Sequence, residues 1–374
     1  MLNLKYRLYP TKKQQTILNN TLDECRWLYN YFLEQRKTSW EQEKKSINYY
    51  SQAVSIVKLK QDRQSLFNVH SQVLQNVAMR VDLAFKSFFR RVKFGEKKIG
   101  YPRFKGQGWY DSITYPQTGF EIIDNGLKLS KIGTLKIKLH RQPDGIIKTC
   151  TIRKTAIGKW YATFSCITNA KPLPKSADAI GIDVGLISFA TFSDNSKIDN
   201  PCFFKTGQKV LAKVQKKLSK AEKGTPERKK RRKVVAKVYD RISNRRNNFC
   251  HQESRKIVNN FGIICIEDLN INKMKENNFR SINRSIGDVA WGQFAQYLSY
   301  KAENAGRQLI KVNPAFTTQD CSRCGYRQVK KLSDRVHRCS CCGFVCDRDH
   351  NAAMNILALG TQSLGSSLEA PSYL

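Results

Sequence analysis

Six of the chain's twelve cysteines crowd together near its C-terminal end, and two Cys-x-x-Cys pairs stand out among them. Cys321 and Cys324 form the first pair, and Cys339 and Cys342 form the second, with 14 residues between the pairs. Thiolates from two such pairs are the usual ligands of a closed tetrahedral Zn²⁺ site. A closed site leaves no open position for a substrate, so the zinc would be structural. The spacing therefore predicts a zinc ribbon over residues 315–346.

Other side chains near these pairs leave alternatives open. Cys341 adjoins the second pair and is an alternative ligand, whereas Cys346 is expected to be spare. His337 is a further alternative ligand, although its position favours a turn residue. The remaining six cysteines are scattered singly through apolar or mixed segments, which is typical of buried, reduced thiols in a cytosolic chain.

Three acidic residues stand at positions where a fold could gather them. Asp183 lies in the strand-like segment Ile180–Gly185, Glu267 follows the apolar run Phe261–Ile266, and Asp349 precedes a helix start. Ligand sites in α/β sheets gather at the carboxyl ends of strands. Carboxylate oxygens favour Mg²⁺, with Mn²⁺ as an alternative, and two such ions about 4 Å apart support phosphodiester hydrolysis. The acids therefore predict a metal-dependent nuclease site.

The neighbours of these acids qualify the prediction. An acid at a helix start, such as Asp349, can cap the helix instead of binding a metal. Asp347 is the nearest rival for the proposed role of Asp349. Gly181 and Gly185 share the strand face of Asp183. Residues as small as glycine on that face are expected to leave room for a metal and a phosphate.

The formal net charge of +36, from 66 Lys and Arg against 30 Asp and Glu, indicates a polyanionic partner. Such a charge binds phosphate backbones in a salt-dependent way. No stretch approaches the roughly 18 consecutive apolar residues that a membrane span requires, and the N-terminus lacks the apolar block of a secretory signal. We expect a cytoplasmic, nucleoid-associated protein with nucleic-acid partners and no membrane.

Positive charge is concentrated between residues 205 and 259, where 19 Lys and Arg face four Asp and Glu. Gly224-Thr225-Pro226 divides this stretch into two predicted helices. A solvated surface hairpin is the alternative, but so much uncompensated repulsion would destabilise it. The residues predicted to bind nucleic acid are Arg228, Lys229, Lys230, Arg231, Arg232, Lys233, Arg241 and Arg245.

The flanking segments predict the elements that must hold these residues. Residues 2–8 predict a strand, and helical patterning from Thr11 to about residue 93 predicts a bundle whose core includes Val54 and Val57. Short alternating segments after residue 101 predict antiparallel strands in a small barrel or sheet. One amphipathic helix is expected over residues 286–302, and the tail from Gly360 is expected to be disordered.

Several motifs together resemble the TnpB, or OrfB, proteins encoded by bacterial insertion sequences, which are relatives of the type V CRISPR nucleases. The matching segments follow the family's order along nearly the whole chain. His350, where the family favours an apolar residue or tyrosine, is a mild departure. The segments are Tyr6–Thr11, Gly181–Gly185, Ile266–Leu269, Trp291–Phe294, Thr318–Gly325, Cys339–Gly343 and Asp347–Ala353.

The resemblance implies an RNA-guided DNA endonuclease with Asp183, Glu267 and Asp349 as its catalytic acids. It would be a multidomain α+β and α/β chain, with one protein favoured per guide RNA. The guide would come from the end of the element, and the target would be double-stranded DNA beside a short flanking motif. The implied domains are the first strand of a wedge-type β-barrel (1–10), a helical recognition lobe (11–100), the rest of the wedge-type barrel (101–175), a RuvC-like domain of the RNase H fold (176–314), the zinc ribbon (315–346), the end of the RuvC-like domain (347–360) and a disordered tail (361–374).

Competing interpretations share much of this evidence. A DNA transposase of the RNase H type would also use an acidic triad, and a guided regulator would carry the same charge without cutting. A junction-resolving nuclease would not need the large basic first half. The zinc ribbon between the second and third acids favours the TnpB-like class over the transposase.

Overall fold

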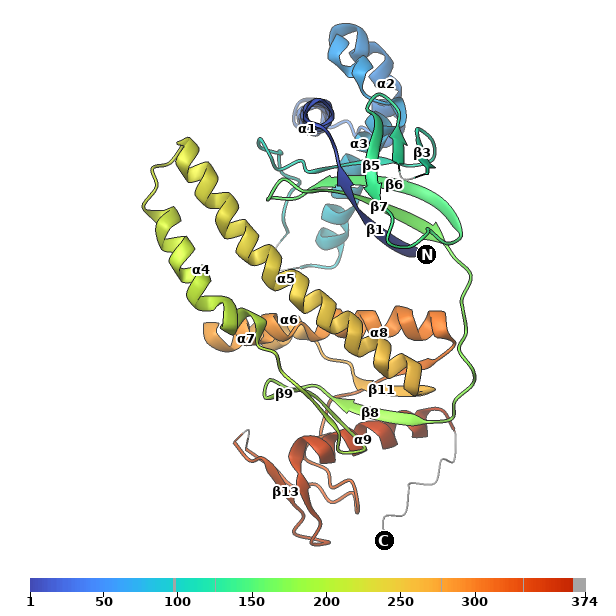
Figure 1. Cartoon of the computed structure of the whole chain (residues 1–374), viewed down its shortest axis with the longest axis vertical. Helices are drawn as coiled ribbons and strands as arrows, with labels where there is room; N and C mark the ends of the chain where they lie inside the picture. The colour runs from blue at the N-terminus through green and yellow to red at the C-terminus, as the bar shows by residue number, and fades with distance from the viewer. Residues whose placement is uncertain (97–98, 125, 277, 332, 366–374) are drawn as a thin grey trace. The chain divides into compact units, whose positions relative to one another are not determined.

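The structure is a computed structural model that describes residues 1–96, 99–124, 126–276, 278–331 and 333–365. The chain divides into two compact units, Met1–Thr168 and Asn169–Leu374 (Figure 1). Among the described residues, no helix is both long and apolar enough to cross a membrane.

The first unit contains the predicted helices. They are α1 (Lys12–Glu43), α2 (Tyr49–Asp62), the 3-10 helix η1 (Gln64–Asn68) and α3 (Ser71–Lys93). Thr11 begins α1 with a capping box, since its hydroxyl accepts from the Gln14 N–H at 3.3 Å and the Gln14 side chain accepts from the Thr11 N–H at 2.9 Å. The prediction that Val54 and Val57 lie in the core is wrong, because they are 74% and 70% exposed. Helix α2 packs through Ile56 and its neighbours on the opposite face.

A seven-stranded, nearly closed barrel-like sheet completes the first unit, in the order β2-β6-β7-β1-β5-β4-β3. Its strands are β1 (Leu2–Tyr9), β2 (Ser112–Tyr115), β3 (Phe120–Ile123), β4 (Gly126–Leu129), β5 (Gly133–Lys138), β6 (Ile146–Lys154) and β7 (Trp160–Ile167). The first strand lies between β5 and β7, which follow it in the chain only after helices α1 to α3 and strands β2 to β4, and all pairs in this sheet are antiparallel. Helices and sheet share one hydrophobic core, in which Tyr6, Phe32 and Trp160 are fully buried.

The second unit is built on a five-stranded sheet in the order β10-β9-β8-β11-β12. Its strands are β8 (Ala179–Asp183), β9 (Ser188–Phe192), β10 (Lys197–Asp199), β11 (Ile263–Glu267) and β12 (Gln308–Val312). Strands β8, β11 and β12 run parallel, and β9 is antiparallel to both of its neighbours, β8 and β10. The apolar run that ends in β11 thus forms an inner strand, as its continuous hydrophobicity predicts.

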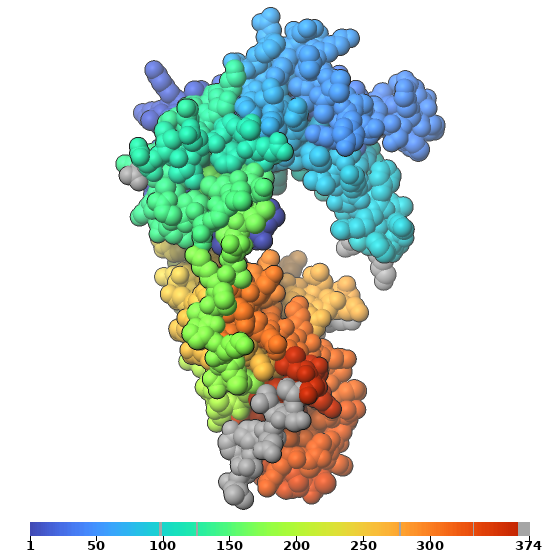
Figure 2. All heavy atoms as spheres, turned by 90° about the vertical axis from the view of Figure 1, so that its right-hand side faces the viewer, coloured from blue at the N-terminus to red at the C-terminus, as the bar shows by residue number. Residues whose placement is uncertain are grey.

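Helices cover both faces of this sheet (Figure 1). They are α4 (Phe203–Ser219), α5 (Pro226–Asn260), α6 (Ile271–Glu276), α7 (Arg280–Val289), α8 (Trp291–Ala305) and α9 (Arg348–Ser363). Helices α5, α7 and α8 share a hydrophobic cluster with β8, β9 and β11, and α9 packs on the other face through Ile356. The segment from the cysteine pairs to α9 forms one continuous surface, coloured orange to red in Figure 2.

Two helix predictions in this unit need correction. Residues 286–302 do not form one helix, because Ala290 adopts a left-handed conformation (φ 59°) that ends α7 and begins α8. Ile286 and Phe294, on either side of the break, are both buried in the same cluster. Helix α9 continues to Ser363, so the disordered tail predicted from Gly360 starts too early. The rest of that prediction, residues 366–374, lies outside the described residues.

Glycines let α9 approach the sheet. A Cβ atom on Gly181 would clash with the carbonyl oxygen of Ala353, and one on Gly360 would clash with the Cys265 sulfur. The expectation that Gly181 leaves room for a metal and a phosphate is therefore wrong. The missing side chain makes space for the backbone of the helix that carries Asp349.

Candidate active site and zinc centre

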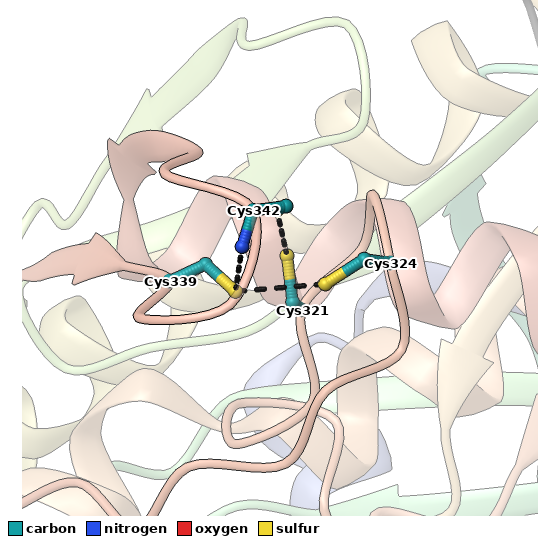
Figure 3. A group of neighbouring side chains, drawn as sticks. All are labelled: Cys321, Cys324, Cys339 and Cys342. Carbon is teal, nitrogen blue, oxygen red and sulfur yellow. Dashed lines mark hydrogen bonds between the residues drawn. The ribbon is translucent and has the colours of Figure 1, made fainter.

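The four predicted zinc ligands converge. Their sulfur atoms all lie within 4.8 Å of one another, and the Cys321–Cys342 and Cys324–Cys339 sulfur pairs are 3.7 and 3.5 Å apart (Figure 3). Four sulfurs bound 2.3 Å from one tetrahedral zinc would lie about 3.8 Å apart. The donor set and its spacing therefore fit zinc. Within the described part of the chain, neither Cys341 nor Cys346 joins this group.

Local turns orient the sulfurs. Gly325 (φ 73°) and Gly343 (φ 71°) follow the two pairs in left-handed conformations. Their N–H groups donate to the carbonyls of Cys321 and Cys339 at 2.8 and 3.0 Å. A hydrogen bond from the Cys342 backbone, together with other contacts within the cluster, lowers the pKa of the Cys339 thiol to about 6. This thiol is thus poised to bind metal as a thiolate.

His337 does not occupy the predicted turn. It is fully buried in β13 (Val336–Arg338), which pairs with β14 (Val345–Asp347), and its ring contacts the Lys330 ammonium. It is not part of the thiol group. The turn prediction is wrong because the chain between the two cysteine pairs returns as a short hairpin strand.

Two asparagines on α9 fasten the ribbon to the sheet domain. The Asn351 side chain accepts from the Ser322 N–H at 3.0 Å and donates to the Asp320 carbonyl at 2.8 Å. One turn later, Asn355 donates to the carbonyls of Thr317 and Asp320, each at 2.8 Å. Sequence reasoning missed this clamp, although the i, i+4 spacing of the two asparagines after Asp349 was its available signal.

The three predicted catalytic acids come from neighbouring elements. Asp183 ends β8 and Glu267 ends β11, and the parallel register that pairs Ile182 with Ile266 puts the two carboxyl groups side by side in the sheet. Asp349 lies in the first turn of α9, which packs against both strands. Elements distant in sequence therefore bring the acids to one edge of the sheet.

The electrostatics of Asp183 reflect this convergence. Asp183 is only 8% exposed. Burial raises the pKa of Asp183 well above its ordinary value, and the charges of Glu267 and Asp349 raise it further. Burial also raises the pKa of Glu267, although a hydrogen bond from Thr317 acts in the opposite direction. The folded chain alone therefore favours the protonated forms of Asp183 and Glu267.

Asp347 has a different environment from its rival Asp349. It is the N-cap of α9, where one carboxylate oxygen accepts from the N–H groups of Asp349 at 2.8 Å and His350 at 3.3 Å. The other oxygen accepts from the Lys197 ammonium at 2.9 Å. Burial alone would raise the pKa of Asp347, but these hydrogen bonds outweigh it and lower the pKa. Asp347 is thus occupied as a helix cap.

The acidic site fits a divalent cation by its donor chemistry. Carboxylate oxygens are the preferred ligands of Mg²⁺, and a cation would relieve the repulsion that raises the pKa of Asp183. In the described ranges, these carboxylates do not form a group as tight as the thiols. Asp349 makes an ion pair of 2.9 Å with Arg348.

The raised pKa of Asp183 predicts how the free energy of unfolding depends on pH. Because its pKa in the folded chain lies above the ordinary 3.8, the folded state keeps a proton that the unfolded state has already released. The free energy of unfolding should therefore fall as pH rises from about 4 through the raised pKa. In buffer without Mg²⁺, we expect Asp183→Asn to be more stable than the wild type at neutral pH, with the difference shrinking toward pH 4. Urea unfolding between pH 4 and pH 8 measures this, and a pH-independent difference would contradict it.

The predicted basic hairpin is present as α4 and α5, which lie side by side (Figure 1). Two of its predicted nucleic-acid ligands are engaged within the protein. Arg228 donates to the carbonyls of Leu218 and Ala221 at the end of α4, and Arg231 pairs with Glu227 at 2.6 Å. Lys229, Lys230, Arg232, Lys233, Arg241 and Arg245 are exposed.

Five exposed cations on α5 recur at every fourth residue and form a basic ridge about 24 Å long. The ridge consists of Lys229, Lys233, Lys237, Arg241 and Arg245. No salt bridge from them is found within the described part of the chain. Sequence reasoning missed Lys237, which the spacing of four residues could have revealed.

Replacing the five cations of the basic ridge with Gln should weaken RNA binding and its dependence on salt. Each lost phosphate contact reduces the slope of log K against log [salt] by about 0.7–0.9, so the full set should reduce it by up to about 4. Filter binding between roughly 50 and 200 mM salt measures the slope. In the matched control, each Lys of the ridge is replaced with Arg and each Arg with Lys, so that every positive charge is kept. An unchanged slope in the Gln variant would mean that the ridge is a solvated surface and does not contact RNA phosphates.

Comparison with sequence families and solved structures agrees with this organisation. Three family profiles match successive segments: a helix-turn-helix domain (1–45), a probable transposase (162–278) and a Cas12f1-like TNB domain (291–356). The first segment is β1 and the single helix α1 in this structure. A solved Cas12f1–sgRNA–target DNA complex has a similar fold, with a TM-score of 0.59 at 15% identity over 92% of this chain and 83% of that chain.

Named relatives extend over most of the chain. A Streptomyces pristinaespiralis protein, provisionally named RNA-guided DNA endonuclease, is 34% identical over 95% of this chain and 88% of its own length. InsQ of Escherichia coli, provisionally given the same function, is 30% identical over 95% of this chain and 91% of its own. Cas12f1 of Sulfoacidibacillus thermotolerans is 29% identical over 53% of this chain and 50% of its own. The chain therefore belongs to the TnpB/OrfB family of insertion-sequence-encoded RNA-guided nucleases.

Proposed function

We propose that this chain is an RNA-guided DNA endonuclease of a transposable element, which cuts guide-matched DNA beside a short flanking motif. The observation that carries the proposal is the convergence of Asp183, Glu267 and Asp349 from β8, β11 and α9. The raised pKa of Asp183, which responds to both other acids, supports their action as one site. The names of relatives that span most of the chain support the substrate class.

In this proposal Asp183, Glu267 and Asp349 hold Mg²⁺, or Mn²⁺ in its place. A divalent metal held there would supply an activated water and charge stabilisation for the leaving 3′ oxygen of the phosphodiester. The residues themselves contribute fixed oxygen donors on adjacent strand ends and a helix start. Because metal binding and protonation compete for Asp183, cleavage should lose activity in acid. Zn²⁺ on the four cysteines holds the ribbon in shape and takes no part in the chemistry.

The remaining parts follow from the family. The mixed sheet of the second unit, with acids at adjacent strand ends, supports a RuvC-like nuclease domain of the RNase H fold. We assign the barrel-like sheet to a wedge-type domain and α1–α3 to a recognition lobe, and we assign guide RNA to the basic ridge. The guide comes from the element's own end, and one protein acts per guide RNA in the bacterial cytoplasm, at the nucleoid.

The test is co-expression with RNA transcribed from the element's own end, followed by a Mg²⁺-dependent cleavage assay. Targets match the 3′ end of the RNA and carry a randomised neighbouring sequence, with Asp183→Ala as the control. We expect guide-dependent cuts beside one enriched motif, and none from the control. Binding of RNA and matched DNA without any cut would overturn the nuclease in favour of a guided regulator.

A second function has one specific observation in its favour. Residues 162–278, which include Asp183 and Glu267, match a profile described as a probable transposase. A transposase would join DNA ends directly with the same acids. The same assay separates the two functions, because cutting or strand joining that ignores the RNA would favour the transposase.

A further inference from the structure

Thr317 makes a short hydrogen bond to one of the proposed catalytic acids. Its hydroxyl donates to Glu267 Oε1 at 2.6 Å and lies 3.2 Å from the carbonyl of Pro314. The residue is only 3% exposed, so water cannot readily replace it as a donor. Glu267 lies 50 residues earlier in the chain, at the end of β11.

The backbone of Thr317 is held by the helix that carries Asp349. Asn355 on α9 donates to the Thr317 carbonyl at 2.8 Å and, through the same nitrogen, to the Asp320 carbonyl at 2.8 Å. Asp320 directly precedes the first zinc ligand, Cys321. The segment from Thr317 to Cys321 is thus fixed at α9 and at the thiol cluster, and its first residue contacts Glu267.

We propose that Thr317 is a positioning residue, which fixes the carboxylate of Glu267 for divalent metal binding and is itself held in place by Asn355. A carboxylate with one oxygen bound to a hydroxyl has fewer orientations available, and its second oxygen stays directed for a ligand. The hydrogen bond thereby couples Glu267 to the segment that leads into the zinc ribbon and to the helix of Asp349. This inference rests on the proposed nuclease function, because it concerns the same site.

The test compares Thr317→Val, which keeps the shape but loses the hydroxyl, with Thr317→Ser, which keeps the hydroxyl. Thr318→Val is the matched control. Thr318 is the same residue type one position along, and its carbonyl accepts from the Lys330 ammonium at 2.8 Å, whereas no hydrogen bond of its hydroxyl is found among the described residues. The readout besides cleavage is the affinity of the full chain for Mn²⁺. It is measured from the decrease of the electron paramagnetic resonance signal of free Mn²⁺. Zinc content and guide-RNA affinity are measured on the same preparations.

We expect Thr317→Val to lower Mn²⁺ affinity and the cleavage rate by about 10- to 100-fold, the usual effect of losing a group that orients a metal ligand. Thr317→Ser should restore both, and Thr318→Val should match the wild type. Zinc content and RNA affinity should not change in any variant.

Two outcomes would overturn the positioning role. One is wild-type Mn²⁺ affinity in Thr317→Val. The other is equal impairment of the Val and Ser variants together with loss of zinc, which would make Thr317 merely structural. Failure of the nuclease proposal is distinguishable, because then the wild type itself would not cut and Glu267→Gln would bind Mn²⁺ as well as the wild type does.

Discussion

Replacing Asp183 with Asn should abolish guide-dependent DNA cleavage while leaving RNA binding intact. Under the proposed mechanism, the substitution removes one metal ligand together with its carboxylate charge at the buried edge of the sheet between β8, β11 and α9. We expect the cleavage rate to fall by at least about 10³-fold, the scale on which a single electrostatic contribution acts in a preorganised site. Single-turnover cleavage measured alongside guide-RNA affinity checks the expectation. Glu267→Gln and Asp349→Asn should have the same effect.

Nearby acids provide matched controls for these three substitutions. Asp268 adjoins Glu267, but its side chain is 67% exposed and pairs with Lys311 at the surface, so Asp268→Asn should cut normally. Asp347→Asn should also cut, with little loss of stability, because the side-chain oxygen of Asn caps a helix about as well as that of Asp. If Asp347→Asn were inactive and Asp349→Asn active, the third acid would be Asp347. Normal cleavage by Asp183→Asn would remove the acidic site from the mechanism altogether.

Loss of the zinc centre should have the second large effect. Cys324→Ser removes one of the four clustered thiols, so the ribbon should lose the zinc that we expect them to bind. Structural zinc contributes on the order of 10 kcal/mol to the folding of small zinc domains, so the ribbon should unfold locally. Because Asn351 and Asn355 connect the ribbon to α9, cleavage should be lost with it. Zinc analysis by mass spectrometry and thermal unfolding measure the two effects together.

Cys341 and Cys346 test whether this effect is specific to the ligands. Both belong to the same short segment, yet within the described residues neither joins the four-sulfur group. Cys341→Ser and Cys346→Ser should therefore keep one zinc per chain and normal cleavage. An unchanged zinc content in Cys324→Ser would refute the ribbon assignment, and zinc loss in Cys341→Ser would mean that this thiol replaces a ligand.

What the sequence by itself determined is mostly local. The four clustered cysteines follow from their spacing, and the start of α1 follows from Thr11. Such signals concern residues a few positions apart, whose geometry the backbone restricts directly. The position of each catalytic acid at a strand end or helix start was predictable in the same way, although its role stays a proposal.

Only the tertiary structure decided how these elements meet. Gly181 serves the close approach of α9, Ala290 divides an expected single helix, and Arg228 caps α4 although it belongs to a run of cations. Thr317 contacts an acid 50 residues away, and no local pattern marks such a pair. These features arise from packing between distant segments, which selects contacts by shape, burial and unmet hydrogen bonds. For the same reason, the charge state of Asp183 depends on the folded chain, because burial and two distant carboxylates together set its pKa.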